Sequence, residues 1–366
     1  MSTKFDAVED AIAAIAAGEL VVVVDDDDRE NEGDLIMAAS KATPDKVAFM
    51  IRHTSGILCT PIVDEQAKRL HLDPMVARND APLSTAFTVS VDYKVGLSTG
   101  ISAEERANTI QALASNNTQA ADFVRPGHIF PLVGRQGGVL VRSGHTEASI
   151  DLAEAAGCPA VGLLAEIIND DGSVQRLPQL MEFAVEYKLK IISIADLIAY
   201  RQRREQLVER SGEFSVKTRV GEARAYAYKT RFEDAEHIAV VVGDIDRSQS
   251  VLVRIHRERL VDDVFGPQTD HDQNLLDVSM QRLADEGGGV FIYLRSGFIG
   301  VPHGHLTEPD SRANERRAEW LEIGVGAQIL RDLGLSKIRI LAGREVDYVG
   351  VEGFGLSLEG TVLLTD

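Results

Sequence analysis

The chain has 366 residues, of which 44% are apolar and 26% charged, and its formal net charge is −19 at neutral pH. This length favours two domains of ordinary size, and the composition is that of a globular protein. The strong negative charge argues against a nucleic-acid partner, because binding to a phosphate backbone needs a basic face.

The sequence also indicates a cytoplasmic protein without a membrane partner. No apolar run reaches the ~18 residues of a membrane span, and the N-terminus lacks the apolar core of a signal peptide. Two cysteines, Cys59 and Cys158, are too few to staple a chain of this length, and the cytosol would keep them reduced.

The first predicted elements lead into an acidic turn. Apolar residues recur at helical spacing over residues 6–17, and Gly18 suits a C-terminal cap. Residues 21–24 are four valines, which predict a short strand buried on both faces. The ten residues 25–34 then hold seven carboxylates and one arginine. Such a run is either a solvated loop or a site for a divalent cation, and its place after a buried strand favours the cation.

Three elements are predicted in the next part of the chain. Residues 44–52 read as a helix that leads into the segment Arg52–Cys59. Residues 87–91 alternate between apolar and polar side chains, as a half-buried strand does. Ser102 is a suitable N-cap for the helix that follows it.

Two histidines are candidate functional residues. His128 lies in residues 125–132, where a glycine and two prolines predict a turn. Residues 142–146 read Arg-Ser-Gly-His-Thr and precede a predicted helix that ends at Gly157. The N–H groups at such a helix start, together with the arginine, suit a phosphate group. His145 is placed to coordinate an ion held by the acidic turn.

One carboxylate, Glu166, stands near the end of a predicted buried strand over residues 159–168. From the residues alone, a proton-transfer group and an edge-strand residue facing water are equally good interpretations. The remaining predicted elements of this half are a turn at 169–172, a helix at 178–188, a strand at 191–194 and an arginine-rich helix at 196–207.

The first half of the chain resembles the 3,4-dihydroxy-2-butanone 4-phosphate synthase family, which converts ribulose 5-phosphate to a four-carbon phosphate and formate in riboflavin biosynthesis. The resemblance covers roughly residues 5–205. Its motifs are Asp-Arg-Glu-Asn-Glu-Gly-Asp at 28–34, Arg-His-Thr-Ser-Gly at 52–56, and the segments 100–110, 125–132 and 142–147.

The resemblance implies the following roles. Ribulose 5-phosphate would be bound by Arg29, Glu30, Asp34, Arg142, Ser143, Gly144, His145, Thr146 and Glu166. Glu30 and His145 would hold Mg²⁺ or Mn²⁺, which oxygen-rich ligation suits better than zinc, with two ions per site expected. His128 and Glu166 would be essential for catalysis, and the family implies a homodimer with sites near the interface. Whether Cys59 and Glu105 contact the substrate stays open, since the family generally has Asp at the position of Glu105.

The second half, after a predicted linker at 209–213, resembles GTP cyclohydrolase II at residues 236–244, 253–258, 263–266 and 323–334. That family holds a catalytic zinc with three cysteines. The matching positions here are Arg259, Asp270 and Asp272, and no cysteine follows Cys158.

Other contacts of that family are replaced as well. Leu321 stands where the family has an arginine, and Ala342 and Asp347 stand where its Thr and Lys contact the nucleotide. Residues 270–272, Asp-His-Asp, favour a solvated loop over an ion site. We therefore expect a fold kept without the cyclohydrolase reaction.

These observations predict an α+β protein with two mixed α/β-layer domains, residues 1–205 and 206–366. The leading hypothesis is an active synthase whose second domain is structural or regulatory. A bifunctional enzyme that retains GTP cyclohydrolase II activity is the alternative, and a non-catalytic binding protein is a third hypothesis. The intact Arg29, Glu30, His128, His145 and Glu166 argue against the third.

Overall fold

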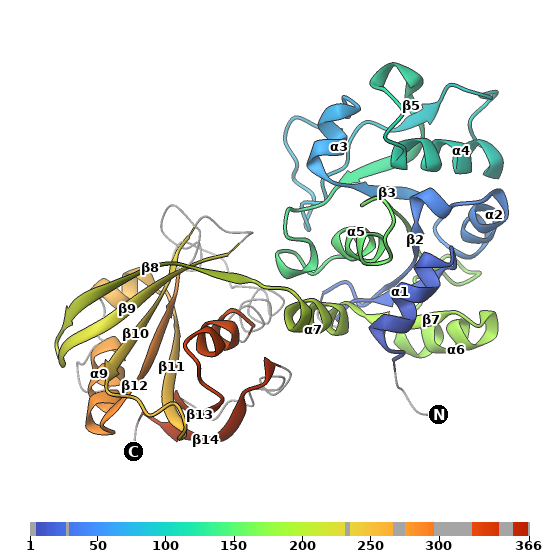
Figure 1. Cartoon of the computed structure of the whole chain (residues 1–366). Coiled ribbons are helices and arrows are strands. Elements are labelled where there is room, and N and C mark those ends of the chain that lie inside the picture. The colour runs from blue at the N-terminus through green and yellow to red at the C-terminus, as the bar shows by residue number, and fades with distance from the viewer. Residues whose placement is uncertain are drawn as a thin grey trace. The chain divides into compact units, whose positions relative to one another are not determined.

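The computed structural model describes residues 5–26, 29–230, 235–265, 275–295, 324–343 and 354–364. The chain divides into two compact units, Met1–Tyr200 and Arg201–Asp366 (Figure 1). In the described part, each unit contains one seven-stranded mixed sheet with helices packed on it. The predicted fold class, two mixed α/β-layer domains, is confirmed.

The N-terminal unit has the strand order β4-β5-β3-β6-β2-β1-β7. Only the pairs β1/β7 and β3/β5 are parallel. Its elements are α1 (Val8–Ala16), β1 (Val21–Val24), β2 (Gly33–Ala38), η1 (Ala39–Lys41), α2 (Pro44–His53), β3 (Cys59–Ile62), α3 (Asp64–Arg69), β4 (Val91–Tyr93), α4 (Ala103–Ala114), η2 (Ala120–Asp122), β5 (Phe123–Val133), η3 (Gly138–Leu140), α5 (His145–Ala155), β6 (Gly162–Glu166), α6 (Leu177–Tyr187), β7 (Lys190–Ser193) and α7 (Ile194–Arg204).

The four valines of β1 anchor the acidic turn. All four side chains are buried, and β1 pairs antiparallel with β2 on one side and parallel with β7 on the other. Burial of each such side chain contributes roughly 1.5–3 kcal/mol. The acidic run is therefore the connection between two central strands, β1 and β2.

Helix α5 forms the centre of the unit and packs against β1, β2, β3 and β6 (Figure 1). Its residues 145–153 are all buried, including polar ones that find partners inside. Asp151 accepts a hydrogen bond from the Val139 N–H at 2.8 Å, and the Ser149 hydroxyl donates to the Thr146 carbonyl at 2.9 Å. A helix enclosed in this way holds its first residue, His145, in a fixed position against the sheet.

The turn predicted at residues 125–132 is wrong, because this segment lies within strand β5. The glycine read as a turn signal serves a close approach instead. A Cβ on Gly127 would lie 2.0 Å from the Val91 carbonyl carbon of β4, so only glycine lets the two strands pair here.

Two other predicted segments also differ from the structure. Residues 87–91 do not form one strand, since Phe87 and Thr88 make only isolated bridges and β4 begins at Val91. Residues 209–213 do not form a linker but belong to β8, which pairs with β9 along its length apart from one bulge. The pairing with β9 gives this polar segment the backbone hydrogen bonds of a strand.

The C-terminal unit has the strand order β14-β13-β11-β12-β10-β9-β8. Residues 324–332 are also helical. Its elements are β8 (Val208–Thr218), β9 (Gly221–Thr230), β10 (His237–Gly243), β11 (Val251–Arg257), α8 (Leu260–Phe265), α9 (Leu275–Asp285), β12 (Gly288–Leu294), β13 (Lys337–Ala342) and β14 (Ser357–Leu363).

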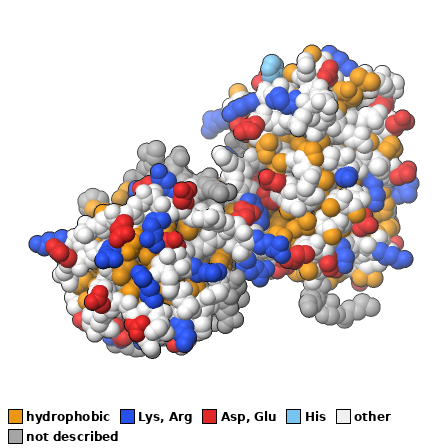
Figure 2. Space-filling view, in the orientation of Figure 1, with side chains coloured by type: hydrophobic (Ala, Val, Ile, Leu, Met, Phe, Trp, Pro, Cys, Tyr) orange, Lys and Arg blue, Asp and Glu red, His pale blue; other side chains and the backbone are white. Residues whose placement is uncertain are grey.

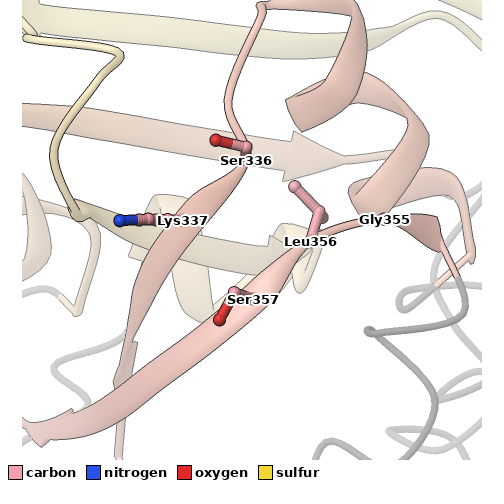
Figure 3. A pocket seen from close by; sticks show the side chains of 5 residues that line it. All are labelled: Ser336, Lys337, Gly355, Leu356 and Ser357. Carbon is pink, nitrogen blue, oxygen red and sulfur yellow. The ribbon is translucent and has the colours of Figure 1, made fainter.

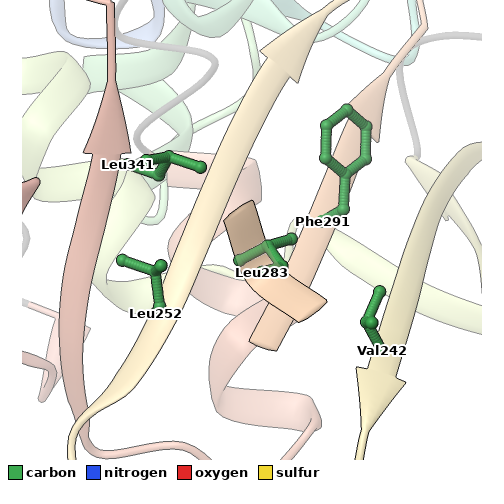
Figure 4. Close-up of a cluster of buried hydrophobic side chains, with 5 residues drawn as sticks. All are labelled: Val242, Leu252, Leu283, Phe291 and Leu341. Atoms are coloured by element: carbon green, nitrogen blue, oxygen red, sulfur yellow. The ribbon is translucent and has the colours of Figure 1, made fainter. Parts of the chain in front are cut away.

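A buried apolar cluster joins α9 to the sheet of this unit (Figure 4). It consists of Val242 on β10, Leu252 on β11, Leu283 on α9, Phe291 on β12 and Leu341 on β13. Because the five residues come from four strands and one helix, the cluster ties distant parts of the sequence into one core.

No helix among the described residues is long and apolar enough to cross a membrane. The face of the molecule shown in Figure 2 carries acidic and basic side chains interspersed. Despite the large negative net charge, that face is therefore not uniformly acidic.

Candidate active site

Asp25 organises the turn between β1 and β2. Its Oδ2 accepts hydrogen bonds from Arg29 Nη1 at 2.9 Å and from the Glu30 N–H at 3.1 Å, and its Oδ1 accepts from the Glu32 N–H at 2.9 Å. The Arg29 guanidinium also pairs with Glu30. The side chains of Asp25 and Arg29 are only 1% and 10% exposed, so the described part of this turn is ordered and inward-facing rather than a solvated loop.

Three ligand-bearing side chains meet at this turn. Asp25, Glu30 and His145 each offer one atom, and these atoms lie within 4.8 Å of one another. His145 Nδ1 is 3.8 Å from Glu30 Oε2 and 3.9 Å from Asp34 Oδ1. His145 Nε2 lies 3.1 Å from the Val23 carbonyl, which only accepts hydrogen bonds, so Nε2 carries the hydrogen. In neutral His145, Nδ1 then presents its lone pair to the acidic turn.

The charges of this cluster perturb its acids and its base. Burial acts to raise the pKa of Glu30, but the hydrogen bond with His145 and the charge of Arg29 lower it to about 2. Burial, together with the charges of Glu166 and Glu30, raises the pKa of Asp34 to about 7 against the pull of His145. Burial opposes protonation of His145, yet Asp34 and Glu30 raise its pKa to about 9.

These residues fit a hard divalent cation. The donor set is rich in carboxylate oxygen, and one imidazole nitrogen faces it. Asp34 Oδ1 is buried, and it finds no hydrogen-bond partner among the residues that the structure describes. An oxygen in that state is costly unless a cation or an ordered water satisfies it. Mg²⁺ and Mn²⁺ prefer this kind of ligation.

A second feature, beside the first turn of α5, suits an anion. Gly144 is the N-cap, and no described side chain caps the helix. A Cβ at Gly144 would lie 2.6 Å from Arg142 Nη1 and 3.2 Å from Arg29 Nη2, so two guanidinium groups border the same small space. Buried Glu147 accepts from Arg142 Nη1 at 2.7 Å and thereby holds that arginine in place. Ser143 is half-buried and Thr146 is buried in this segment.

Glu166, at the end of β6, adjoins the candidate metal cluster. It is the cross-strand partner of Asp34 on β2, and its Oε2 accepts a hydrogen bond from the Ser55 hydroxyl at 2.7 Å. Of the two interpretations of Glu166, the structure favours a residue of this site over an edge-strand residue, because β6 lies in the interior of the sheet.

His128 lies on β5 in line with Glu166. Cys59 on β3 pairs with both Phe130 and Leu164. His128 precedes Phe130 by two residues, and Glu166 follows Leu164 by two in an antiparallel strand, so both lie toward the same end of the sheet. Strands are about 4.8 Å apart, which places His128 and Glu166 roughly 10 Å from each other. The His128 ring is held by Asp92, whose Oδ2 is 2.7 Å from Nδ1.

The two residues left open, Cys59 and Glu105, have different surroundings. Cys59 is buried, and burial together with the charges of Glu166 and Asp34 raises the pKa of its thiol, so it is a poor nucleophile. The carboxylate of Glu105 accepts hydrogen bonds from the hydroxyls of Ser98 and Ser102, at 2.7 and 2.8 Å. Glu105 therefore completes a capping box of α4.

Sequence reasoning missed four residues of the site. Asp25 had a usable signal, because it is the first carboxylate after a buried strand. Ser55 lay in a quoted motif but had no assigned role. Asp92 and Glu147 meet their partners His128 and Arg142 only through the fold, by strand pairing and by the start of α5.

Comparisons with known proteins show which family the chain belongs to. Residues 9–200 match the family model of 3,4-dihydroxy-2-butanone 4-phosphate synthase, and residues 209–363 match that of GTP cyclohydrolase II. The chain belongs to the 3,4-dihydroxy-2-butanone 4-phosphate synthase family. It is accordingly an enzyme, a lyase of riboflavin biosynthesis.

Curated relatives share nearly the full length of the chain. The bifunctional riboflavin biosynthesis protein RIBA 1 of Arabidopsis thaliana is 48% identical and covers 98% of this chain and 69% of that protein. The protein of the same plant named monofunctional, RIBA 2, is also 48% identical, over 98% of this chain and 77% of its own length. RibBA of Bacillus subtilis is 43% identical, and the match covers 98% of this chain and 94% of that protein.

Two solved structures are also similar. RibBX, described as a two-domain 3,4-dihydroxy-2-butanone 4-phosphate synthase from A. baumannii, has a TM-score of 0.83 and 36% identity and covers 98% of this chain and 99% of that chain. A 3,4-dihydroxy-2-butanone 4-phosphate synthase in complex with two magnesium ions has a TM-score of 0.53 and 42% identity. It covers 55% of this chain and 98% of that chain.

The described part of the C-terminal unit holds two of its predicted substituted positions. The Arg259 N–H donates to Asp263 Oδ2 at 2.8 Å just before α8, and Ala342 is buried at the end of β13. His256, Asp263 and Tyr293 form a buried hydrogen-bonded group beside Arg259. Asp270, His271, Asp272, Leu321 and Asp347 lie outside the described residues.

A cavity of about 380 Å³ in this unit lies near the starts of β13 and β14 (Figure 3). Ser336, Lys337, Gly355, Leu356 and Ser357 line it. Among the described residues, Lys337 is the single charged one that lines it, and none of the described lining residues is a predicted site residue.

Proposed function

We propose that the synthase reaction is carried out at the acidic turn, the start of α5 and the ends of β5 and β6. The observation that supports this most directly is the meeting of Glu30, Asp34 and His145 beside Glu166, with two arginines bordering Gly144. A bound Mg²⁺ or Mn²⁺ would polarise sugar oxygens and stabilise the negative charge that develops on them.

The phosphate of ribulose 5-phosphate is assigned to the start of α5. Arg29 and Arg142 supply two guanidinium groups, and the N–H groups of His145 and Thr146, in the first turn of the helix, lie at the same end. Arg142 is oriented by Glu147, and Ser143 lies between the arginine and the helix. Binding at this point would place the sugar carbons toward Glu30, Asp34 and Glu166.

Proton transfer is assigned to His128 and Glu166. They lie toward the same end of β5 and β6, the two strands on either side of β3. Strand spacing puts them roughly 10 Å apart, so a five-carbon sugar fits between them. The reaction requires proton movements in enolisation, loss of water, skeletal rearrangement and release of formate. Groups held on rigid strands perform such transfers well.

The experiment that tests these assignments is a turnover assay with ribulose 5-phosphate, in which formate and the four-carbon phosphate are both quantified. We expect activity with added Mg²⁺ or Mn²⁺, loss of activity after chelation and recovery on adding back either ion. Formation of both products at an undiminished rate in chelator would contradict the metal assignment. This activity with Mg²⁺ or Mn²⁺ should not require added zinc.

For the C-terminal unit we propose a structural or regulatory role without GTP hydrolysis. The support is chemical, because no cysteine follows Cys158 and three thiolates are what the related enzyme uses to hold zinc. The second candidate is a bifunctional enzyme, which the match over residues 209–363 and the bifunctional relatives favour. Incubation with GTP and measurement of formate distinguishes the two.

We also propose a cytoplasmic homodimer formed by the N-terminal unit. Large apolar side chains are exposed in the segment that surrounds β4, namely Ile57, Met75, Val76, Leu83, Val95 and Ile101, with exposures from 41% to 66%. Leu83 lies next to Arg142 in this arrangement, since its carbonyl accepts from Arg142 Nη2 at 3.3 Å. A second copy covering this segment would adjoin the site. Sedimentation analysis of Val95→Glu, with Val185→Glu on exposed α6 as control, tests the interface.

A further inference from the structure

One buried carboxylate holds both the backbone and the ring of His128. Asp92 Oδ1 accepts the His128 N–H at 2.9 Å, and Asp92 Oδ2 is 2.7 Å from His128 Nδ1. The Asp92 side chain is 4% exposed, whereas that of His128 is 40% exposed. Asp92 is therefore the buried anchor of the pair, and the far edge of the imidazole, with Nε2, is the part left accessible.

The backbone at Gly100 packs closely against the side chains of Asp92 and His128. A Cβ at Gly100, whose φ is +84°, would lie 2.2 Å from Asp92 Oδ2 and 2.7 Å from His128 Nδ1. The loop that contains Gly100 is held by Glu105, through Ser98 and Ser102 on either side. Two features thus fix the position of the pair, the β4–β5 pairing and the capped start of α4.

Buried Arg106, on the same helix α4, is electrostatically coupled to Asp92. Burial lowers the pKa of Arg106 and the charge of Asp92 raises it. Arg106 Nη1 donates to the Gly56 carbonyl at 3.4 Å. Both oxygens of Asp92 lie within hydrogen-bond distance of nitrogens of His128, and a carboxylate that accepts at both oxygens suits this geometry.

We infer that Asp92 is a positioning residue that fixes the tautomer of His128 and so makes Nε2 a proton acceptor. This inference rests on the proposed role of His128 in proton transfer. An ionised carboxylate only accepts, so Nδ1 must carry the hydrogen and Nε2 must be unprotonated in neutral His128. A proton taken from the substrate forms a bond to Nε2, the imidazolium is stabilised by Asp92, and the proton is returned in a later step.

The substitution Asp92→Asn tests the tautomer directly. The backbone N–H of His128 can only donate, so it selects the amide oxygen of the asparagine. The amide NH₂ then faces Nδ1, which must become the acceptor, and the hydrogen moves to Nε2. His128 would keep its place in the strand but lose its basic nitrogen. We expect kcat to fall about 10²–10⁴-fold with KM changed by less than about threefold.

Ser90→Ala is the matched control in the same strand pairing. The Ser90 hydroxyl accepts the Gly127 N–H at 3.1 Å, beside His128, whereas the His128 ring nitrogen Nδ1 pairs with Asp92. If Asp92 served strand pairing alone, the two substitutions would have similar effects. We expect Ser90→Ala to retain kcat within about threefold and to retain the wild-type tautomer.

The deciding readout is ¹⁵N NMR of the histidine side chains in the full chain, with the His128 signals identified by their absence in His128→Gln. Wild type should show protonated Nδ1 and unprotonated Nε2, and Asp92→Asn the reverse. Protonated Nε2 in neutral wild-type His128 would overturn the inference even if the variant fails to fold. The inference would also be overturned if Asp92→Asn has the reversed tautomer and an unchanged kcat while His128→Gln is inactive. An active His128→Gln would instead remove the proposed role of His128 while the tautomer result stands.

Discussion

Each carboxylate of the acidic turn has its own environment. Asp25 accepts hydrogen bonds inside the turn, Glu30 is paired with Arg29, and Asp34 Oδ1 is buried with no hydrogen-bond partner among the described residues. His145 faces the last two from the opposite side, held by the Val23 carbonyl. A net excess of carboxylate over arginine at this point favours a divalent cation.

The first prediction concerns the ion ligands. Glu30→Gln and His145→Ala should each abolish metal-dependent turnover at limiting Mg²⁺, because each removes one of the few groups that face the ion. The fold should persist, since β1, β2 and α5 are held by apolar packing. Turnover is measured against Mg²⁺ concentration with circular dichroism as the folding control. An unchanged metal dependence in either variant would rule out these ligands.

The second prediction concerns Glu166. Glu166→Gln preserves the hydrogen bond from Ser55, because the amide oxygen also accepts, but it removes the proton-transfer group. We expect kcat to drop ~10²–10⁴-fold with metal and substrate binding retained. Steady-state kinetics and calorimetric titration with Mn²⁺ measure the two effects. A change confined to KM would mean that Glu166 only binds the substrate.

At the level of elements, the sequence predicted best where a local signal, such as apolar spacing, an apolar run or a capping residue, decides the structure. The helices α1, α2, α4 and α5 and the strand β1 were predicted correctly, the last from four consecutive valines. Two of the three failures, a predicted turn and a predicted linker, have one physical cause. Residues 125–132 and 209–213 carry glycine and polar residues typical of turns, yet a neighbouring strand supplies their hydrogen bonds and keeps them extended.

The same distinction explains which site residues could be predicted. Arg29, Glu30 and His145 belong to motifs within single segments, whereas Glu166 was named only because of the family resemblance. Asp92 lies 36 residues from His128, and only the pairing of β4 with β5 brings them together. A pattern within one segment contains no information on such a partner.

The third prediction concerns the core of the C-terminal unit. Leu283 on α9 is fully buried against β10, β11 and β12, so Leu283→Ala should lower the free energy of unfolding by about 2–5 kcal/mol. Leu260→Ala, at a position that is 42% exposed, is the control and should cost far less. The stability of this unit is measured by hydrogen exchange of peptides that cover residues 288–294, detected by mass spectrometry. Equal effects of the two substitutions would contradict the assignment of the core.

At the scale of the whole molecule, one buried histidine links stability to pH. His237 on β10 is 1% exposed; its Nδ1 accepts the Arg295 N–H at 3.1 Å, and burial together with the Arg295 charge lowers its pKa to about 4. The unfolded chain binds this proton near pH 6.5 and the folded one only near pH 4. Stability from neutral His237 is therefore complete above pH 6.5 and is lost as pH falls toward 4, in total about 3 kcal/mol.

The fourth prediction follows from that linkage. His237→Asn keeps an acceptor for the Arg295 N–H but cannot titrate, so its urea midpoint should fall less than that of wild type between pH 7 and pH 5. His71→Asn, at an exposed histidine, is the control and should follow wild type. A wild-type pH dependence in His237→Asn would show that other groups cause the acid sensitivity.

The last prediction concerns the two halves of the chain as separate catalysts. Purified protein should contain no stoichiometric zinc and should release no formate from GTP while it converts ribulose 5-phosphate. Catalytic zinc needs three protein ligands and an open position for water, and thiolates bind this ion far better than carboxylates do. The resemblance to GTP cyclohydrolase II also places Arg259, with its fixed positive charge, at one of the three expected ligand positions.

Combined replacement of Arg259, Asp270 and Asp272 by cysteine separates loss of metal from loss of catalysis. We expect about one zinc per chain in the triple variant, by elemental analysis, but still no GTP hydrolysis. The reason is that the resemblance to GTP cyclohydrolase II places Leu321 where that family has an arginine, and Ala342 and Asp347 where it contacts the nucleotide. Substitution of serine for the same three residues controls for the removal of charge. One zinc per unmodified chain together with formate release from GTP would instead establish the bifunctional enzyme.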